Sequence, residues 1–321
     1  MKSKPILIVP GDPNSIFFEI FFKSIKKNIY KSPLILISSL DILKSEMKIA
    51  NIKKTVRLIN HKNLKNIKID NKTINLINID SNLNFNFKKY PKHSKIYIYE
   101  CFKLAFRILR TKFTNKLING PINKTKFLNK KFLGITEYIS YKFNQKKTAM
   151  LIYNKEISVC PITTHLPLKS VTKKISKKLI LDKTILINDF YRKNVGFKPK
   201  IAVTSLNPHC ESISNFDEDK MIISPAIKFI RKSGYNVNGP FSADTIFLKK
   251  NRTKYDVILG MYHDQVLSPF KTLFEYDAIN ITLGLPFFRI SPDHGTNEKM
   301  IGKNLSNPLS LIASIKFLDK K

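Results

Sequence analysis

The sequence predicts an α/β fold in which helices cover both faces of a parallel sheet. Short, unbroken apolar runs alternate along the chain with segments whose apolar residues recur at helical spacing. Unbroken apolar runs are typical of strands that are buried on both faces, as strands are in parallel sheets. Many of these runs end in glycine, proline or asparagine, which mark the turns after strands.

Strands and helices are expected in alternation from the start of the chain. In order, they are a strand at 5–10, a helix at 19–26, a strand at 33–37, a helix at 100–111 and a strand at 117–121. Residues 60–92 show only weak period-two alternation, so we expect either short strands at 67–70 and 74–79 or a loose excursion there. The recurring passage from strand to helix is the pattern of a parallel α/β sheet.

Three further strands each lead into a histidine. The strands are expected at 157–164, 200–206 and 257–261, and they are followed by His165, His209 and His263. Because ligands of open α/β sheets bind beyond the carboxyl ends of the strands, we expect the three imidazoles to share one site. Three neutral imidazoles and an open coordination position are what a catalytic divalent metal requires. The sequence spacing is too wide for a local metal motif, so the fold must bring these ligands together.

Two aspartates accompany these histidines as candidate catalytic residues. Asp264 follows His263 directly, and Asp244 lies in the segment Ala243-Asp244-Thr245. Either carboxylate can orient a ligating imidazole or accept a proton, and either can instead cap a helix without a catalytic purpose. We favour the functional interpretation for Asp264, whereas both interpretations stand for Asp244.

Polar and cationic residues interrupt the apolar runs near the C-terminus. Lys271, Asn280 and Arg289 are costly to bury without a partner, and a phosphate or carboxylate would satisfy the two cations. Further on, the turn Asp293-His294-Gly295-Thr296 offers backbone donors and a glycine for close approach, as the phosphates of a dinucleotide need. No Gly-x-Gly-x-x-Gly occurs, which excludes a standard Rossmann fingerprint.

The formal charge of +34, from 57 Lys and Arg against 23 Asp and Glu, is extreme for a chain of 321 residues. A positive charge of this size is typical of proteins that bind nucleic acid. However, the lysines are scattered through every segment beside Asn and Ile. We therefore explain the charge by a drift of the composition toward Lys, Asn and Ile, which leaves a solvated basic surface. The alternatives are attraction of an anionic phosphorylated substrate and dinucleotide and, least favoured, binding of nucleic acid.

The cysteines and the apolar runs bear on the compartment. Cys101, Cys160 and Cys210 are odd in number and widely spaced, which favours reduced thiols in the cytoplasm. Two interpretations stand for Cys210, which follows His209: a soft metal ligand and a small buried thiol. We favour the buried thiol. No run approaches the roughly 18 apolar residues of a membrane span, and the run at 5–10 is too short for the core of a signal peptide.

Several motifs follow one another in a characteristic order along nearly the whole chain. They are Gly11-Asp12-Pro13, Gly120-Pro121-Ile122-Asn123-Lys124, Thr136-Glu137, Thr164-His165-Leu166-Pro167-Leu168, Leu206-Asn207-Pro208-His209, Ala243-Asp244-Thr245, Tyr262-His263-Asp264-Gln265 and Gly284-Leu285-Pro286 through Asp293-His294-Gly295-Thr296. In this order they resemble the 4-hydroxythreonine-4-phosphate dehydrogenase family of vitamin B6 synthesis.

This resemblance implies a two-domain α/β/α architecture similar to the isocitrate and isopropylmalate dehydrogenases, with the active site in the interdomain cleft. We place the first domain at 1–125 and 271–321, and the second, with the metal histidines and the dimer contacts, at 126–270. The resemblance also implies a homodimer. Each divalent metal ion (Zn, Mg or Co) would be held by His165, His209 and His263, with one of these ligands coming from the other subunit.

The resemblance further implies substrate contacts from Thr136, Lys271, Asn280 and Arg289, and NAD or NADP as the cofactor. The implied reaction is oxidation of the C3 hydroxyl of 4-phosphooxy-L-threonine, followed by decarboxylation to 3-amino-2-oxopropyl phosphate. A metal on the hydroxyl would lower its pKa and later polarise the new ketone.

Ile135 departs from the family pattern. The family has Gly-His-Thr-Glu where this chain has Gly134-Ile135-Thr136-Glu137, so an isoleucine replaces a histidine that contacts the substrate. Two alternatives therefore stay open: a dehydrogenase of another phosphorylated hydroxy acid, such as 4-phospho-D-threonate, and a decayed, non-catalytic paralogue. The three retained histidines argue against decay.

Overall fold

The computed structural model describes residues 3–26, 29–79, 91–123, 127–128, 132–213 and 216–321. The chain divides into unit 1, which is Met1–Ile135 with Pro286–Lys321, and unit 2, which is Thr136–Leu285. The division predicted from the sequence lies earlier in the chain, at 125 and 270. The difference includes strand β11 (Ile279–Leu283), which pairs with strand β6 (Ala149–Tyr153) of unit 2.

Unit 1 is built on a parallel arrangement of strands. They are β1 (Ile6–Val9), β2 (Leu34–Ser38), β3 (Val56–Leu58), β4 (Ile74–Asn78), β5 (Lys116–Asn119) and β12 (Phe288–Pro292), in the spatial order β3-β4-β2-β1-β5-β12. Each neighbouring pair in this order is parallel. Strands β1, β2 and β5 are buried throughout, as the unbroken apolar runs predict.

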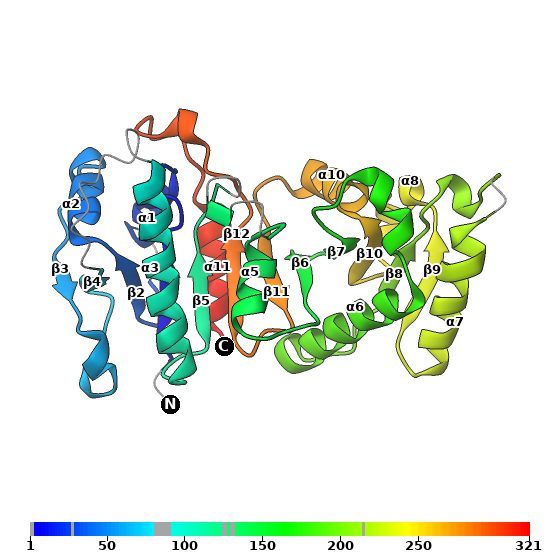
Figure 1. Ribbon diagram of the computed structural model, residues 1–321, viewed down its shortest axis with the longest axis horizontal. Helices are drawn as coiled ribbons and strands as arrows, with labels where there is room; N and C mark the ends of the chain where they lie inside the picture. The colour runs from blue at the N-terminus through cyan, green and yellow to red at the C-terminus, as the bar shows by residue number, and fades with distance from the viewer. Residues whose placement is uncertain (1–2, 27–28, 80–90, 124–126, 129–131, 214–215) are drawn as a thin grey trace. The chain divides into compact units, whose positions relative to one another are not determined.

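The helices of unit 1 are α1 (Phe17–Lys26), α2 (Leu40–Ile49), α3 (Pro91–Arg110) and α11 (Leu309–Asp319) (Figure 1). The connection from β1 through α1 leads to β2 on one side of β1, whereas the connection from β4 through α3 leads to β5 on its other side. Right-handed crossovers that run in opposite directions place their helices on opposite faces of a sheet. The strand order therefore reverses between β1 and β5, which is where ligands bind in such sheets.

Unit 2 contains β6, β7 (Ser158–Thr163), β8 (Ile201–Thr204), β9 (Val237–Phe241), β10 (Val257–Tyr262) and β11, in the spatial order β11-β6-β7-β10-β8-β9. Strands β7, β10, β8 and β9 are parallel. By contrast, β6 pairs antiparallel with both β11 and β7, so this sheet is mixed, although the apolar runs are typical of parallel strands. Only residues 154–157 connect β6 to β7, which is too short for a parallel crossover.

The helices of unit 2 are α5 (Ile135–Lys142, whose first residue belongs to unit 1), α6 (Lys177–Phe190), α7 (Ser224–Lys232), α8 (Ala243–Ile246), α9 (Lys249–Arg252) and α10 (His263–Phe274). Shorter 3-10 or π turns are η1 (His61–Asn66), η2 (Leu168–Ser170), η3 (Thr172–Lys174), η4 (Tyr191–Val195), η5 (Pro208–Cys210), η6 (Asp219–Ile223) and η7 (Glu298–Met300). Helix α10 packs on β7 and β10, and α6 packs on β6, β7 and β11.

The stretch of weak alternation holds one of its two expected strands. Residues 74–78 form β4, but residues 67–70 form no strand. There the backbone amide of Lys72 donates to the Asp70 carboxylate at 2.9 Å, which makes a turn in place of an extended segment. Residues 80–90 of this stretch, and Lys124 of the motif at 120–124, lie outside the described residues.

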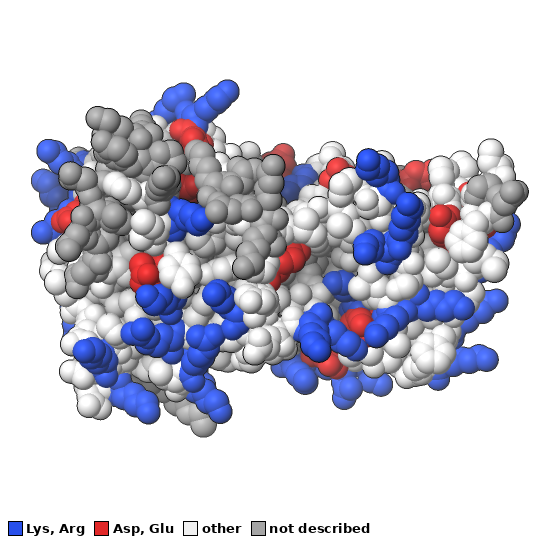
Figure 2. Space-filling view, viewed as in Figure 1, with Lys and Arg blue, Asp and Glu red and all other residues white. Residues whose placement is uncertain are grey.

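Basic side chains are spread over the surface. Figure 2 shows Lys and Arg on many separate parts of the visible face, among fewer Asp and Glu. This distribution resembles the scattering of lysine along the sequence, and the expectation that nucleic acid is no partner stays a prediction. In the part of the chain that the structure describes, no helix combines the length and the hydrophobicity that a membrane crossing demands.

A close backbone approach in unit 1 predicts the effect of a single methyl group. A Cβ at Gly120 would lie 1.9 Å from the carbonyl oxygen of Pro10, and backbone atoms cannot move aside. Gly120→Ala should therefore lower the free energy of unfolding by about 1–3 kcal/mol or more. Urea denaturation measures the loss. Gly295→Ala is the control, because its nearest neighbour would be 3.7 Å away, and equal losses in both variants would contradict the prediction.

Candidate functional site

The carboxyl ends of three strands meet at one edge of the unit 2 sheet. In the parallel register, Tyr262 of β10 lies beside Thr163 of β7, and Leu259 of β10 lies beside Val203 of β8. His165 comes just after β7, His263 is the first residue of α10 after β10, and His209 lies in η5 after β8. The predicted passage of each strand into its histidine is therefore confirmed.

His165 and His263 lie next to each other at this edge. Their ring centroids are 6.0 Å apart, with an interplanar angle of 39°. Nδ1 of His263 lies 2.7 Å from a carboxylate oxygen of Asp264, which is largely exposed. A carboxylate on one ring nitrogen fixes the imidazole and leaves Nε2 for a ligand. The helix-cap alternative is wrong for this residue, since the N-cap of α10 is Tyr262.

Glu137, in the first turn of α5, lies close to His165. Its Oε1 lies 3.9 Å from His165 Nδ1, and Thr164 Oγ1 donates to the same oxygen at 3.3 Å. Burial raises the pKa of Glu137, but the interactions with His165, the backbone and Thr164 outweigh it and leave the pKa below its usual value. Its Oε2 is buried and has no hydrogen-bond partner among the described residues.

These residues fit part of a divalent-metal site. Two imidazoles, each with a carboxylate near Nδ1, are the donor set that zinc or cobalt accepts. Within the described residues, however, no three His, Cys, Asp or Glu side chains are arranged to hold a metal. The single chain therefore brings His165 and His263 together and leaves the exposed His209 outside the pair. The role of His209 as a ligand stays a prediction.

Gln265 connects the carboxyl ends of β8 and β10. Its Oε1 accepts hydrogen bonds from Met261 N at 2.7 Å and from Thr204 Oγ1 at 2.8 Å. Its Nε2 donates to the carbonyl oxygen of Ser205 at 2.7 Å. The side chain is buried, so each bond is made where water does not compete. Gln265 thus fixes the start of α10, which carries His263, to the end of β8.

A second polar cluster lies at the carboxyl ends of the unit 1 strands, at the point where the strand order reverses. Arg289 of β12 is fully buried, and its Nε donates to Asn119 Oδ1 at 2.7 Å. In the parallel register Arg289 lies beside Leu117, so reaching Asn119 directs the guanidinium toward the carboxyl end of β5. The loops after β1 and β5 also touch, because Asp12 N donates to the carbonyl oxygen of Pro121 at 2.8 Å.

The predicted cofactor turn follows β12 in unit 1. Asp293 N donates to Ser310 Oγ at 2.8 Å, and Ile16 N donates to the carbonyl oxygen of Thr296 at 3.1 Å. His294 Nδ1 lies 2.9 Å from the carbonyl oxygen of Gly295. The turn is therefore tied to the start of α11 and to the residue before α1.

The other predicted residues lie on separate elements of unit 2. Thr136 is buried in α5, Lys271 is half-buried in α10, and Asp244 is exposed in the first turn of α8. The N-cap of α8 is Ser242, so the capping interpretation of Asp244 is wrong. Asn280 lies on β11, where its buried Oδ1 has no hydrogen-bond partner among the described residues. A buried acceptor without a donor is suited to a ligand that can donate.

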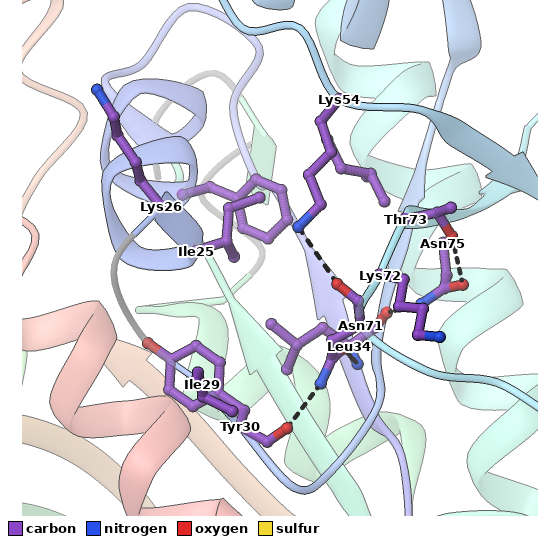
Figure 3. A pocket seen from close by; sticks show the side chains of 12 residues that line it. Ile25, Lys26, Ile29, Tyr30, Leu34, Lys54, Asn71, Lys72, Thr73 and Asn75 are labelled. Atoms are coloured by element: carbon purple, nitrogen blue, oxygen red, sulfur yellow. Dashed lines mark hydrogen bonds between the residues drawn. The ribbon is translucent and has the colours of Figure 1, made fainter.

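A pocket of about 540 Å³ in unit 1 is a different kind of feature. It lies at the amino ends of β2 and β4, beside Leu34 and Ile74, where parallel sheets do not bind their substrates. Figure 3 shows that its polar groups bond to one another: Lys54 donates to the Asn71 carbonyl oxygen, and the Asn71 amide donates to the Tyr30 carbonyl oxygen. It is therefore not the candidate active site.

The chain matches the family model of the pyridoxal phosphate biosynthetic protein PdxA over residues 30–318. The chain belongs to this family. It is 36% identical to a 4-hydroxythreonine-4-phosphate dehydrogenase of Sulfurihydrogenibium sp. (strain YO3AOP1), across 97% of this chain and 96% of the relative. It is also 31% identical to a D-threonate 4-phosphate dehydrogenase of Salmonella typhimurium, across 98% of each.

Solved structures show the same fold. A putative 4-hydroxythreonine-4-phosphate dehydrogenase from Salmonella typhimurium superposes with a TM-score of 0.85 at 29% identity, over 99% of both chains. The corresponding dehydrogenase from Klebsiella pneumoniae gives 0.83 at 27% identity, again over 99% of both chains. The predicted family and α/β fold are confirmed, and the chain is an oxidative dehydrogenase of the PdxA family.

Sequence patterns alone do not indicate the roles of Glu137, Gln265 and Asn119. All three lie in or beside motifs of the chain, which are Thr136-Glu137, Tyr262-His263-Asp264-Gln265 and the turn that begins at Gly120. Each acts through a partner far away in the chain, such as Thr204 for Gln265. Their position in or beside a motif is the signal that the sequence offers for these residues. The hydrogen-bond partner that defines each role is seen only in the folded chain.

The environment of Glu137 predicts a pH dependence of stability. Because the folded-state pKa lies below the usual 4.5, ionised Glu137 contributes stability that is present above the unfolded pKa and lost as pH falls through the folded value. Glu137→Gln should therefore unfold more easily at neutral pH and lose less stability than wild type on acidification below 4.5. Urea denaturation on both sides of that pH measures this difference.

Glu100→Gln is the matched control, because Glu100 is an exposed partner of Lys103 on α3. It should keep the acid sensitivity of the wild-type chain. An unchanged pH dependence in Glu137→Gln would contradict the role given to this carboxylate.

Proposed function

We propose that this chain oxidises 4-hydroxythreonine 4-phosphate with NAD or NADP and a divalent metal ion, and that decarboxylation follows to give 3-amino-2-oxopropyl phosphate. The main support for this proposal is the pair His165 and His263. Their ring centroids lie 6.0 Å apart at the neighbouring carboxyl ends of β7 and β10. The name of the relative that is 36% identical over 97% of this chain supports the choice of substrate.

In this proposal His165 and His263 hold the metal through Nε2, with Glu137 and Asp264 near their Nδ1 atoms. The third ligand is His209 of a second copy, which makes the active form a homodimer with shared metal sites. When bound, the metal would polarise the oxygen at C3 of the substrate, and the dinucleotide would accept the hydride. Asp264 keeps the His263 imidazole oriented, and Asp244 is the candidate proton acceptor.

In this proposal the cationic and hydrogen-bonding residues bind the phosphate and carboxylate groups of the substrate. Arg289 is fully buried and held by Asn119, so its guanidinium is already ordered before an anion arrives. An ordered cation away from water attracts a phosphate more strongly than a solvated lysine does. Lys271, Asn280 and Thr136 provide the remaining contacts, and the backbone of 293–296 binds the dinucleotide phosphates.

A second candidate is oxidation of 4-phospho-D-threonate. Ile135 is the first residue of α5, next to the buried Thr136, and it offers no hydrogen bond where the family pattern has a histidine. The Salmonella typhimurium relative named for D-threonate 4-phosphate is 31% identical across nearly the whole chain.

Comparison of the two substrates tests the choice. With NAD and a divalent metal, the purified chain should produce NADH from 4-phosphooxy-L-threonine with a higher kcat/KM than from 4-phospho-D-threonate. Ile135→His should raise that kcat/KM further, because it restores a donor beside Thr136. NADH formation from the D-threonate compound alone would select the second candidate.

Removal of either paired histidine tests the metal site. His165→Ala and His263→Ala should each lower turnover about a hundredfold or more, because a metal stabilises the transition state by several kcal/mol. Both should also weaken Zn²⁺ binding in calorimetry. His61→Ala, in η1 of unit 1, is the control and should keep wild-type turnover and affinity. Unchanged Zn²⁺ affinity in both site variants would remove the basis of the proposal.

A further inference from the structure

The turn that carries His209 has an uncommon backbone. His209 and Cys210 have φ angles of 56° and 65°, in the left-handed region that residues other than glycine rarely adopt. Two such residues in succession persist only where the surrounding contacts hold them. The turn has its own hydrogen bond from Cys210 N to Asn207 O at 3.3 Å, and the residues just before it are held by a buried carboxylate.

Asp219, the first residue of η6, accepts hydrogen bonds from Leu206 and Asn207, which precede the turn. Its Oδ1 accepts from Leu206 N at 2.8 Å, and its Oδ2 accepts from Asn207 N at 2.9 Å and from Asn207 Nδ2 at 3.0 Å. Asp219 is almost completely buried. All three donors belong to the two residues between Ser205 and Pro208, so one carboxylate restrains the whole approach to His209.

Asp219 and the segment that it holds are each bonded to a further element. Asp219 N donates to Asp217 Oδ1 at 2.9 Å, and η6 continues directly into α7. On the other side, Ser205 O accepts from Gln265 Nε2, which holds the segment to the start of α10. The chain that leads to His209 is therefore tied at one end to η6 and at the other to the helix that carries His263.

We propose that Asp219 is a positioning residue for His209. By bonding Leu206 and Asn207 it sets the backbone from which the His209 imidazole departs, and so prepares that imidazole to bind the metal of a second copy. This inference rests on the proposed function, in which His209 is the shared ligand. Loss of a residue that orients a metal ligand typically weakens metal affinity about ten- to hundredfold.

The test uses Asp219→Asn. An amide in place of the carboxylate turns one acceptor oxygen into an NH₂ group, which then faces an N–H of Leu206 or Asn207 and cannot bond to it. Asp256→Asn is the matched control. Asp256 precedes β10, and its Oδ2 accepts from Lys200 N at 2.7 Å, so this variant changes an aspartate that bonds to the backbone just before the amino end of β8.

Zn²⁺ is titrated into the metal-free dimer of the wild type, both aspartate variants and His209→Ala, and thermal denaturation of the metal-free proteins is measured in parallel. Asp219→Asn should lower Zn²⁺ affinity at least tenfold, whereas Asp256→Asn should stay within twofold of wild type even where its Tm falls as much. Wild-type affinity in Asp219→Asn, or an equal loss in Asp256→Asn, would overturn the positioning role.

The His209→Ala arm separates the two levels of the argument. If this variant binds Zn²⁺ as the wild type does, the shared-ligand part of the proposed function fails. If His209→Ala loses affinity and Asp219→Asn does not, the proposed function stands and only the role of Asp219 is refuted.

Discussion

Parallel pairing of β7, β10 and β8 is the constraint on which the unit 2 site depends. Strands that run in the same direction end at the same edge, so residues that follow them are neighbours although they are far apart in sequence. Tyr262 beside Thr163 sets the register that places His263 next to His165. An antiparallel β10 would send its carboxyl end, and His263 with it, to the opposite edge.

Buried polar side chains convert this arrangement into a defined geometry. Gln265 makes three hydrogen bonds across β8 and β10, and Asp219 accepts three from the segment before His209. A buried polar atom without a partner is destabilising, so such side chains admit few alternative conformations. Gly260 of β10 allows α10 to pack closely on the strand because it has no side chain. A Cβ there would lie 2.2 Å from Cγ1 of Val266.

Unit 1 follows the same logic with a different outcome. Its strand order reverses between β1 and β5, and the loops after these strands touch through Asp12 and Pro121. Arg289 lies buried at this point, and its Nε donates to the neutral amide oxygen of Asn119. Unit 2 thus brings two imidazoles and their neighbouring carboxylates together, whereas unit 1 places a buried guanidinium at the point where its strand order reverses.

The sequence by itself determined seven of the strands, which are β1, β2, β4, β5, β7, β8 and β10. It also determined the histidine that follows each of three of them, because strands and turns depend on local hydrophobic patterns and on turn-forming residues. It did not show β3, β6, β9, β11 or β12, and so it missed the antiparallel pairing of β6 with β11 and β7. Only the tertiary structure decided that His165 meets His263 and not His209, and that Glu137 and Asp219 support the histidine segments. These contacts depend on strand order and register, and hydrophobic periodicity carries no record of which strands become neighbours.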